Sequence, residues 1–342
     1  MKTQTIQGQT GESRIVIGEH LANLCHYSKS DRCVLITDDN VHHYYRQYFN
    51  DTPVIVIGTG ESIKTIKTVQ EIYEKLIDYE IDRTWTVVGV GGGIVTDIAG
   101  FVASTYLRGL RFGFVSSTLL AQVDASVGGK NGVNFHGYKN MVGVFNQPEF
   151  VLCDLEMLHT LPEREVRCGF AEVVKYALIG DPSLFEFLEN NYTQALAIDR
   201  EVLERIVYDC VAAKAKVVQR DEREKGGRRV LNFGHTFGHA YEKTIGIPHG
   251  EAVSLGTVIA TELSVRKGKL SEIAVDRIRK LLKHFELPTT AACDKTKMFD
   301  AITKDKKREG DAVHFVLLNE IGRPIIEPVS FDELKGIIDD LC

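Results

Sequence analysis

Histidines and carboxylates gather in the second half of the chain at a spacing that suits metal binding. His235 and His239 are one helical turn apart and so share a helix face, and His249 follows soon after. Upstream, Glu172 and Lys175 share a face of another helical pattern. Three histidines and a carboxylate can hold a zinc ion and leave one coordination position open. Each histidine alone would suit a hydrogen-bonded core position as well, but the group favours a metal site, and the lack of H-E-x-x-H disfavours a zincin-type protease.

A glycine-rich turn, Gly89–Asp97, follows an apolar run and precedes a helical pattern. Glycines let the backbone approach a pyrophosphate, and a helix N-terminus favours its negative charge. The spacing departs from G-x-G-x-x-G, because Thr96 stands where the third glycine would be. The turn is therefore either a tight strand-to-helix connection without a ligand or a nucleotide site, and its strand–turn–helix context favours the nucleotide.

Two charged segments are weaker candidates. Gly128-Gly129-Lys130 resembles a phosphate loop only superficially, since Asp124 and Asn131 stand where the motif needs glycine and Ser/Thr. Asp124, Lys130, Lys139 and Asn140 crowd this short, glycine-rich, strand-poor stretch, which is either a site loop or a solvated one. The run Asp221–Arg229 is likewise either a solvated turn or an anion pocket beside the metal.

The composition excludes several classes of protein. The chain has 342 residues, of which 44% are hydrophobic and 26% charged, as in an ordinary globular protein and unlike a disordered chain. Its 41 basic and 47 acidic residues give a net charge of −6, which argues against general nucleic-acid or anionic-membrane binding but permits a local basic pocket. The polar N-terminus indicates no secretory signal, and no apolar run suits a membrane span. Seven scattered cysteines without C-x-x-C indicate free thiols in the cytoplasm.

The elements that must position these residues differ between the two parts of the chain. Up to about residue 155, continuous apolar runs alternate with helical patterns, which is typical of parallel strands covered on both faces. Repeated strand–helix–strand units predict an α/β doubly wound, Rossmann-like N-terminal domain over residues 1–158. Strands are expected at Arg14–Gly18, Cys33–Thr37, Val54–Gly58, Thr86–Val90 and Phe112–Ser116, with a helix over Glu61–Tyr79.

The strand pattern fades after about residue 160, which predicts a mainly α-helical C-terminal domain over residues 159–342. Pro162 and Pro182 stand where proline favours a first helical turn. A short hairpin is expected near Phe315–Ile326. Helices are expected at Pro162–Ile179, Pro182–Asn190, Ile198–Arg220, Leu231–Ile245, Glu251–Lys267 and Ser271–Phe285.

Together these motifs resemble the 3-dehydroquinate synthase family of sugar phosphate cyclases, and imply its fold. The resemblance keeps the motif order and covers nearly the whole chain. Its blocks are Gly91–Gly100, Gln122–Lys130, Lys139-Asn140, Leu161–Glu165, Gly169–Tyr176, Asp221–Glu224, Asn232–His239 and His249–Glu251.

The resemblance implies a carbon–oxygen lyase that converts 3-deoxy-D-arabino-heptulosonate 7-phosphate to 3-dehydroquinate and phosphate, in the shikimate pathway of aromatic amino acid biosynthesis. It implies transient NAD-dependent oxidation, phosphate β-elimination, re-reduction, ring opening and intramolecular aldol closure. One divalent ion, Zn²⁺ or Co²⁺, is the implied Lewis acid. The resemblance also implies a homodimer with a small-molecule sugar phosphate substrate.

Carried over by position, the resemblance implies Glu172, His235 and His249 as the metal ligands. His239 then faces the substrate, which replaces the pairing of His235 with His239 suggested by helical spacing, and Lys175 stands near the reacting hydroxyl. The resemblance places Arg108 at the substrate phosphate and Lys307, or its neighbour Lys306, in the segment that closes the site. The rest of the implied substrate pocket is Asp124, Lys130, Asn140, Lys214, Arg228 and Asn232.

The implied NAD site is centred on the glycine turn. Asp38 is expected to bind the adenosine ribose by analogy with other dinucleotide-binding acids, although it precedes the glycines here. The full implied set is Asp38, Asn40, Glu61, Lys64, Gly91, Gly92, Gly93, Asp97, Ser117, Thr118, Lys139, Thr160, Leu161 and Glu165.

At two places the sequence departs from the residues most common in this family, which leaves alternative functions open. These are Ile94-Val95-Thr96 after the glycines and Asn131-Gly132 after Lys130. They are compatible with another sugar phosphate cyclase or with a metal-dependent polyol dehydrogenase. Arg228 and Asn232 together favour the dehydroquinate enzyme, since relatives tend to change residues in that pocket.

Overall fold

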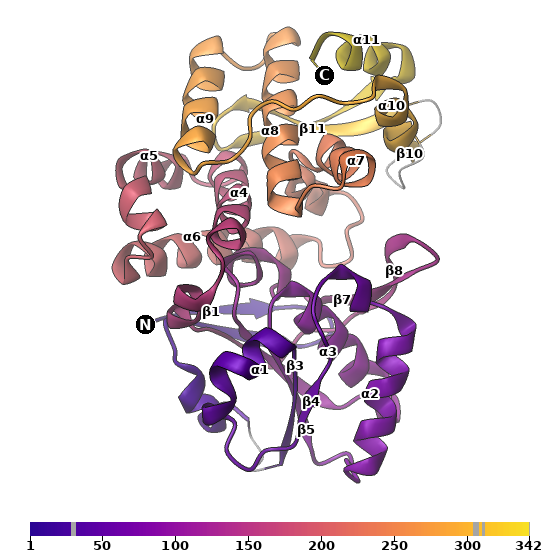
Figure 1. The fold of residues 1–342 in the computed structure, drawn as a ribbon. Helices are drawn as coiled ribbons and strands as arrows, with labels where there is room; N and C mark the ends of the chain where they lie inside the picture. Colours follow the sequence, from indigo (N-terminus) through magenta and orange to yellow (C-terminus); the bar gives the residue numbers. More distant parts are fainter. Residues whose placement is uncertain (29–31, 304–307, 310–311, 342) are drawn as a thin grey trace. The chain divides into compact units, whose positions relative to one another are not determined.

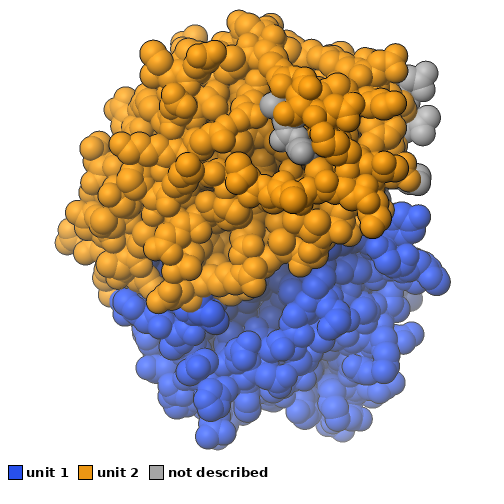
Figure 2. Space-filling model, turned by 45° about the horizontal axis from the view of Figure 1, so that its top comes forward, with its two compact units in different colours: residues 1–162, 203–223 blue, residues 163–202, 224–342 orange. Residues whose placement is uncertain are grey.

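The computed structural model of the protein describes residues 1–28, 32–303, 308–309 and 312–341. It divides into two compact units, coloured separately in Figure 2. Unit 1 comprises Met1–Pro162 and Leu203–Arg223, and unit 2 comprises Glu163–Val202 and Glu224–Cys342. Leu203–Arg223 thus groups with the N-terminal part although it follows the predicted boundary at residue 158. The assignment of functions to domains stays a prediction.

Unit 1 is built on a seven-stranded sheet (Figure 1). β1 and β2 pair antiparallel, and all other neighbours are parallel. The five predicted strands are confirmed, whereas β1 and β9 were not expected, because one is short of apolar residues and the other is very short. In spatial order the strands are β1 (Lys2–Gln7), β2 (Glu12–Ile17), β9 (Phe150–Cys153), β6 (Arg111–Ser116), β5 (Thr86–Gly91), β3 (Cys33–Thr37) and β4 (Val54–Val56).

Helices cover both faces of this sheet, so the doubly wound prediction is confirmed. On one face, Val88 and Val90 of β5 belong to a buried cluster with Val41 of α1 (Asp39–Tyr45). Side chains alternate along a strand, so Gly89 belongs to the opposite face. A β-carbon on Gly89 would lie 2.8 Å from Ala99 Cβ, which places α3 (Gly93–Thr105) on that face.

The order of the strands creates a switch point between β3 and β5. From β3 the chain continues through α1 and the 3₁₀ turn η2 (Arg46–Tyr48) to β4 at one edge of the sheet. From β5 it continues through α3 and η4 (Tyr106–Arg108) to β6 on the other side. In open α/β sheets, ligands bind beyond the carboxyl ends of the strands at such a point.

Two parts of unit 1 depart from the predicted elements. The predicted helix Glu61–Tyr79 is a 3₁₀ turn, η3 (Glu61–Ile63), followed by α2 (Ile66–Asp78), because the Thr65 side chain caps α2. The strand-poor interpretation of the Gly128–Asn140 stretch was wrong. That stretch enters a two-stranded hairpin, β7 (Lys130–Phe135) and β8 (Tyr138–Phe145), whose glycines and asparagines hide the strand pattern.

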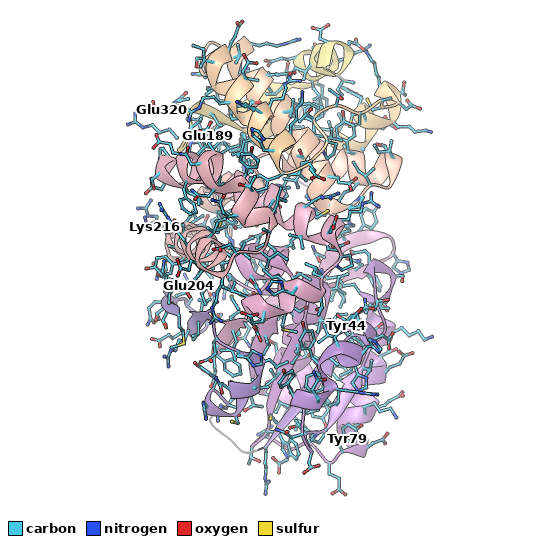
Figure 3. All side chains as sticks on the ribbon, turned by 60° about the vertical axis from the view of Figure 1, so that its left-hand side comes forward. Tyr44, Tyr79, Glu189, Glu204, Lys216 and Glu320 are labelled. Atoms are coloured by element: carbon cyan, nitrogen blue, oxygen red, sulfur yellow. The ribbon has the colours of Figure 1, made fainter. Side chains whose placement is uncertain are left out.

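The remaining elements of unit 1 are short, apart from one long helix. α6 (Arg200–Arg220) begins in unit 2 and runs mostly in unit 1, and it carries Glu204 and Lys216, labelled in Figure 3. The short elements are the 3₁₀ helices η1 (Leu21–His26) and η6 (Leu155–Thr160) and the π-helical turn η5 (Ala121–Ala125).

Unit 2 is mainly helical, as predicted, and adds one three-stranded antiparallel sheet. Its core includes Phe237, Leu255, Phe315 and Leu317. The expected hairpin is confirmed. The elements are α4 (Glu163–Ile179), α5 (Pro182–Leu196), η7 (Gly227–Asn232), α7 (His235–Ile245), α8 (His249–Arg266), α9 (Glu272–His284), α10 (Lys295–Thr303), β10 (Arg308–Glu309), β11 (Ala312–Glu320), β12 (Arg323–Ser330) and α11 (Phe331–Leu341).

One helix boundary matters for the site. The sequence predicts a helix from Leu231, but α7 begins at His235. Gly234 has φ 76°, in the left-handed region, so it interrupts the helical pattern and caps α7. In the part of the chain that the structure describes, no helix is both long and apolar enough to cross a membrane.

Candidate active site

Three helices of unit 2 bring together one carboxylate and two histidines. Glu172 lies in the middle of α4, His235 is the first residue of α7, and His249 is the first residue of α8. Their donor atoms all lie within 4.8 Å of one another. Glu172 Oε1 is 3.4 Å from His235 Nε2 and 3.2 Å from His249 Nε2. Among the described residues this is the group of donors arranged for a metal ion.

Both histidines are oriented by an acceptor behind the ring. His235 Nδ1 lies 2.9 Å from the carbonyl oxygen of Phe233, and His249 Nδ1 lies 3.3 Å from Glu242 Oε2. With a metal ion bound, each Nδ1 would donate its proton to that acceptor and each Nε2 would present its lone pair to the ion. Glu242 was not among the residues predicted from the sequence. Its position two helical turns after His235 on α7 is a signal that could have revealed it.

The electrostatics of this cluster rest on a buried ion pair. Lys175 Nζ lies 2.5 Å from Glu172 Oε2, and both side chains are almost fully buried. Burial alone would raise the pKa of Glu172, but the charge of Lys175 and the contacts from His235 and His249 outweigh it and hold that pKa well below its usual range. Glu172 is therefore ionised and ready to act as an anionic ligand.

The two histidines of this group differ in basicity. Burial lowers the pKa of His235 to about 4, so its ring is neutral at ordinary pH. Burial also lowers the pKa of His249, but hydrogen bonds to Glu172 and Glu242 outweigh it and raise that pKa to about 10. The carboxylates therefore outweigh the effect of burial on the pKa of His249 but not on the pKa of His235.

His239 lies beside this cluster. Its ring centroid is 5.4 Å from that of His235 and 6.3 Å from that of His249. It lies one turn after His235 on α7, as the spacing predicts. Since it does not join the group of converging donors, the geometry agrees with a role outside the ligand set.

Two further residues that were predicted to bind the substrate lie on η7. Arg228 is buried with 2% of its surface exposed, and Asn232 donates through Nδ2 to Glu224 Oε1 at 3.0 Å. A buried guanidinium is costly unless it meets an anion or other acceptors, so Arg228 is not an ordinary surface charge. Glu224 was not among the predicted site residues, although it belongs to the charged run.

The first part of the charged run is also not a solvated turn. Glu222 is only 5% exposed. Its carboxylate accepts from the Gln9 backbone N–H at 2.6 Å and from Gln147 Nε2 at 2.8 Å. Gln147 in turn lies against Gly129, next to Lys130. These contacts join the end of α6 to the glycine-rich loop within unit 1.

A second ion pair joins the same two segments. Lys214 Nζ donates to Asp124 Oδ1 at 2.5 Å and to the Asp124 carbonyl at 2.7 Å. Lys214 is 6% exposed, whereas Lys130 is exposed at the start of β7. The structure therefore brings Asp124 and Lys214 together and leaves the Lys130 side chain at the surface of unit 1.

The residues predicted to bind NAD lie on both sides of the switch point of the sheet. Asp38 follows β3 and caps α1 by accepting from the Val41 N–H at 2.9 Å, and burial raises its pKa. Gly91 ends β5, Gly92 caps α3, and Gly93 begins that helix. A β-carbon on Gly91 would lie 2.6 Å from Val95, so tight packing requires this glycine as well.

A lysine connects the turn after β4 to α3 and to the β7–β8 hairpin. Lys64 Nζ donates to Asp97 Oδ2 at 2.5 Å and to Asn140 Oδ1 at 2.6 Å. Burial raises the pKa of Asp97, although Lys64 opposes this effect. Asn140, predicted for the substrate pocket, thus lies with two residues predicted for NAD. Glu61 belongs to the same network, because it accepts from Asn134 Nδ2 at 2.7 Å.

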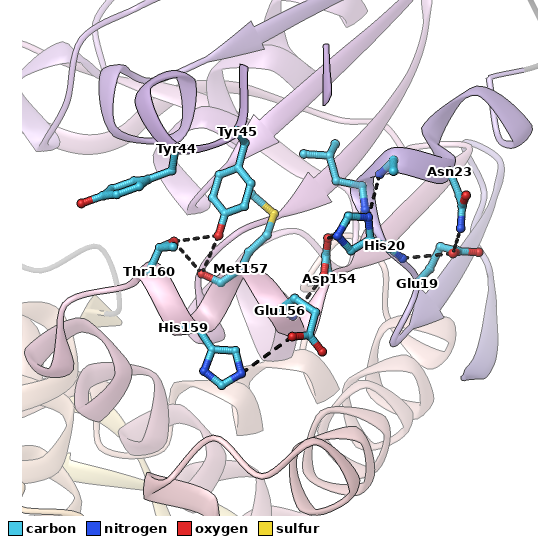
Figure 4. Close-up of polar contacts among 12 residues, drawn as sticks. Glu19, His20, Asn23, Tyr44, Tyr45, Asp154, Glu156, Met157, His159 and Thr160 are labelled. Atoms are coloured by element: carbon cyan, nitrogen blue, oxygen red, sulfur yellow. Dashed lines mark hydrogen bonds and ion pairs between the residues drawn. The ribbon is translucent and has the colours of Figure 1, made fainter. Parts of the chain in front are cut away.

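Figure 4 shows the segment after β9, where Thr160 lies near α1. The Thr160 hydroxyl is 2.7 Å from the Tyr45 hydroxyl and also donates to the Met157 carbonyl at 3.1 Å. Nearby, buried Asp154 accepts from the backbone N–H groups of Leu21 and Glu156. Thr160 is thereby held against the end of α1, and Tyr45 is a neighbour that the sequence did not reveal.

The remaining predicted residues are placed as follows. Ser117 and Thr118 follow β6, and the Ser117 N–H donates to the Gly91 carbonyl at 3.0 Å. Asn40, Lys139, Glu165 and Arg108 are exposed, and Arg108 has φ 67° at the end of η4. Leu161 is half-buried, while Lys306 and Lys307 lie outside the described residues.

Comparisons with known proteins agree over most of the chain. The family model for the 3-dehydroquinate synthase N-terminal region matches residues 54–168, and that for the C-terminal region matches residues 169–308. A relative from Geobacter metallireducens, named 3-dehydroquinate synthase, is 47% identical over 289 residues, covering 83% of this chain and 80% of the relative.

Solved structures of related cyclases have the same fold. One is 2-deoxy-scyllo-inosose synthase with carbaglucose-6-phosphate, NAD⁺ and Co²⁺, at TM-score 0.88 and 30% identity over 98% of this chain and 99% of that one. Another is 2-epi-5-epi-valiolone synthase from Streptomyces hygroscopicus with NAD⁺ and Zn²⁺, at TM-score 0.88 and 26% identity over 96% of both chains. The identity to the Geobacter relative is higher than to either of these cyclases.

Proposed function

Since the chain belongs to the 3-dehydroquinate synthase family, we propose that Glu172, His235 and His249 hold the metal ion of its reaction. The enzyme converts 3-deoxy-D-arabino-heptulosonate 7-phosphate to 3-dehydroquinate and phosphate, with NAD and one divalent metal ion as cofactors. When bound, NAD⁺ supplies a reversible hydride acceptor and the metal ion a Lewis acid. The observation that carries the metal assignment is the convergence of three donors within 4.8 Å.

The donor set fits a catalytic metal ion. Two imidazoles and one carboxylate are a known catalytic zinc set that leaves a position open for substrate, and the same nitrogen and oxygen donors suit Co²⁺. We propose Zn²⁺ or Co²⁺ as the ion. The Lys175 Nζ, held 2.5 Å from Glu172 Oε2, supports a role for this lysine in orienting the reacting hydroxyl, because its ammonium can donate a hydrogen bond to a hydroxyl oxygen beside the donor group.

NAD⁺ is proposed to bind across the β3–β5 switch point. Asp38 after β3 would bind ribose hydroxyls, and the N-terminus of α3 at Gly92 would accept the pyrophosphate. Lys64, tied to Asp97 and Asn140, would fix the position of the β7–β8 hairpin beside the cofactor. The other predicted cofactor residues are proposed in the same role.

The substrate carries a carboxylate and a phosphate, so its pocket needs cations despite the net charge of −6. Lys214 in unit 1 and Arg228 in unit 2 are each almost fully buried, which supports for each a role in binding an anionic group of the substrate rather than that of a surface charge. We assign Asp124, Lys130, Asn232 and His239 to hydroxyl and proton contacts, and Arg108 and Lys307 to the phosphate.

The decisive assay is phosphate release from 3-deoxy-D-arabino-heptulosonate 7-phosphate with NAD⁺ and Zn²⁺. Equal amounts of phosphate and dehydroquinate are expected, with no net NADH and with loss of activity on chelation. Net NADH formation from an alcohol would instead indicate a polyol dehydrogenase. No turnover by folded, metal-loaded protein would contradict the assigned substrate and favour another sugar phosphate cyclase.

Replacing Arg228 tests the substrate assignment. Arg228→Ala is expected to raise KM for the heptulosonate phosphate by about 10–100-fold, because a hydrogen bond to a charged group contributes roughly 1.5–3 kcal/mol. The affinity for NAD⁺ should stay near that of the wild type. Steady-state kinetics and NAD⁺ titration separate the two effects, and Arg223→Ala, at an exposed arginine of the same run, is the control. A selective loss of NAD⁺ affinity would move Arg228 out of the substrate pocket.

Three broader assignments complete the proposal. Residues 1–158 are assigned to NAD binding and residues 159–342 mainly to metal and substrate binding. A homodimer is supported by the β7–β8 hairpin, which exposes Phe135, Tyr138 and Met141. A cytoplasmic location is supported by the free thiols of the described cysteines. Light scattering at micromolar concentration checks the oligomer, and a monomer would contradict it.

A further inference from the structure

The two histidines proposed as ligands differ in the chemistry behind their rings. Phe233 provides a neutral backbone carbonyl 2.9 Å from His235 Nδ1. Glu242 provides a carboxylate oxygen 3.3 Å from His249 Nδ1. The Glu242 side chain is 10% exposed, so this contact lies largely out of water. An interaction between a carboxylate and an imidazole is stronger there than at an exposed surface.

The Glu242 contact constrains His249 on both sides of the ring. Nε2 lies 3.2 Å from Glu172 Oε1, and Nδ1 faces Glu242 on the opposite edge. A ring held at both nitrogens cannot flip without losing both contacts. His249 is the more exposed of the two ligand histidines, with 33% of its side chain accessible against 10% for His235. The orientation of the His249 ring therefore depends more on a contact from another side chain than that of His235 does.

We propose that Glu242 is a positioning residue of the metal site, which locks His249 with Nε2 toward the ion and strengthens that ligand through its negative charge. This inference rests on the proposed metal assignment. Carboxylates behind ligand histidines fix the tautomer and raise the basicity of the ring, and their loss typically costs 10–100-fold in metal affinity. Glu242 also comes from α7, the helix that begins with His235, so it couples both histidine ligands to one element.

The experiment measures Zn²⁺ affinity of the whole chain by competition with a chromophoric chelator. Glu242→Ala is expected to raise the Zn²⁺ dissociation constant by about 10–100-fold. Glu242→Gln keeps an acceptor oxygen but removes the charge, so a smaller loss is expected. Glu251→Gln is the matched control, because Glu251 also lies in unit 2, two residues after His249, but pairs with Arg164. Its affinity should equal that of the wild type.

A spectroscopic readout separates positioning from a general structural defect. In Co²⁺-loaded protein, Glu242→Ala is expected to change the visible d–d absorption, because the His249 ligand is no longer fixed. Circular dichroism and thermal unfolding of the metal-free variants check that the fold is kept. Wild-type Zn²⁺ affinity and an unchanged Co²⁺ spectrum in Glu242→Ala would overturn the proposal.

The same titrations distinguish this inference from the metal assignment itself. If His235→Ala binds Zn²⁺ as tightly as the wild type, the proposed ligand set fails. If His235→Ala loses Zn²⁺ while Glu242→Ala retains full affinity, only the role of Glu242 fails.

Discussion

His235→Ala is expected to lose metal and activity together. A site with three protein ligands cannot lose one and still hold its metal ion. Loss of even a residue that only hydrogen-bonds to a ligand typically costs about 10–100-fold in metal affinity. Among the proposed ligands, His235 is also the histidine whose low pKa of about 4 keeps its ring neutral and free to bind a metal at ordinary pH. Zinc content after gel filtration should fall below about a tenth of the wild-type value, and kcat/KM should fall at least about a hundredfold.

His239→Ala is the matched comparison for this prediction. Its ring lies 5.4 Å from that of His235 on the same helix, yet it does not join the converging donors. It should keep its zinc and lose activity only. If the two variants exchanged these outcomes, His239 would be a ligand and His235 would not. Wild-type zinc content in His235→Ala would likewise remove it from the ligand set.

Buried strands and amphipathic helices could be predicted from local sequence, because burial on both faces of a sheet requires continuous apolar runs. Runs such as Val34–Ile36 and Val87–Val90 are buried along their whole length in the sheet. The β7–β8 hairpin could not be predicted in this way. Most of β8 is exposed, and close backbone contact at Gly132 and Gly143 replaces apolar side chains.

The site was predictable to a different degree at each residue. The i,i+4 spacing alone paired His235 with His239, and only the resemblance to a family selected His249 instead. Contacts between distant segments left no local signal. The Lys64 contact with Asn140 and the burial of Glu222 by Gln147 depend on how the chain folds back on itself. A run of charged residues is therefore predicted to be solvent-exposed when its partners lie far away in the sequence.

The closeness of the three ligand-bearing helices depends on two glycines, which leads to a second strong prediction. A β-carbon on Gly256 of α8 would lie 1.9 Å from the carbonyl oxygen of Gly234, the residue that caps α7. A β-carbon on Gly250 would lie 2.3 Å from the carbonyl oxygen of Cys168 on α4. Both obstacles are backbone atoms, which cannot rotate away. These helices therefore meet backbone to backbone, close enough for the ligands to converge.

Gly256→Ala is accordingly expected to weaken metal binding without changing any ligand. The methyl group must push α8 away from the start of α7, which separates His249 from His235. Overpacking of this kind costs about 1–3 kcal/mol, so the melting temperature of a chain of this length should fall by roughly 1–4 °C, and Zn²⁺ affinity should fall with it. Differential scanning fluorimetry and chelator competition measure the two effects.

Gly336→Ala provides the control, because Gly336 lies in α11 with no atom near its would-be β-carbon. An exposed helical glycine replaced by alanine should stabilise the protein by about 0.4–1 kcal/mol and leave zinc binding unchanged. Gly256→Ala with wild-type stability and wild-type Zn²⁺ affinity would show that the α7–α8 contact relaxes easily. If its stability fell but its Zn²⁺ affinity did not, the ligands would be held by their own hydrogen bonds, through Phe233 and Glu242, rather than by the approach of the helices.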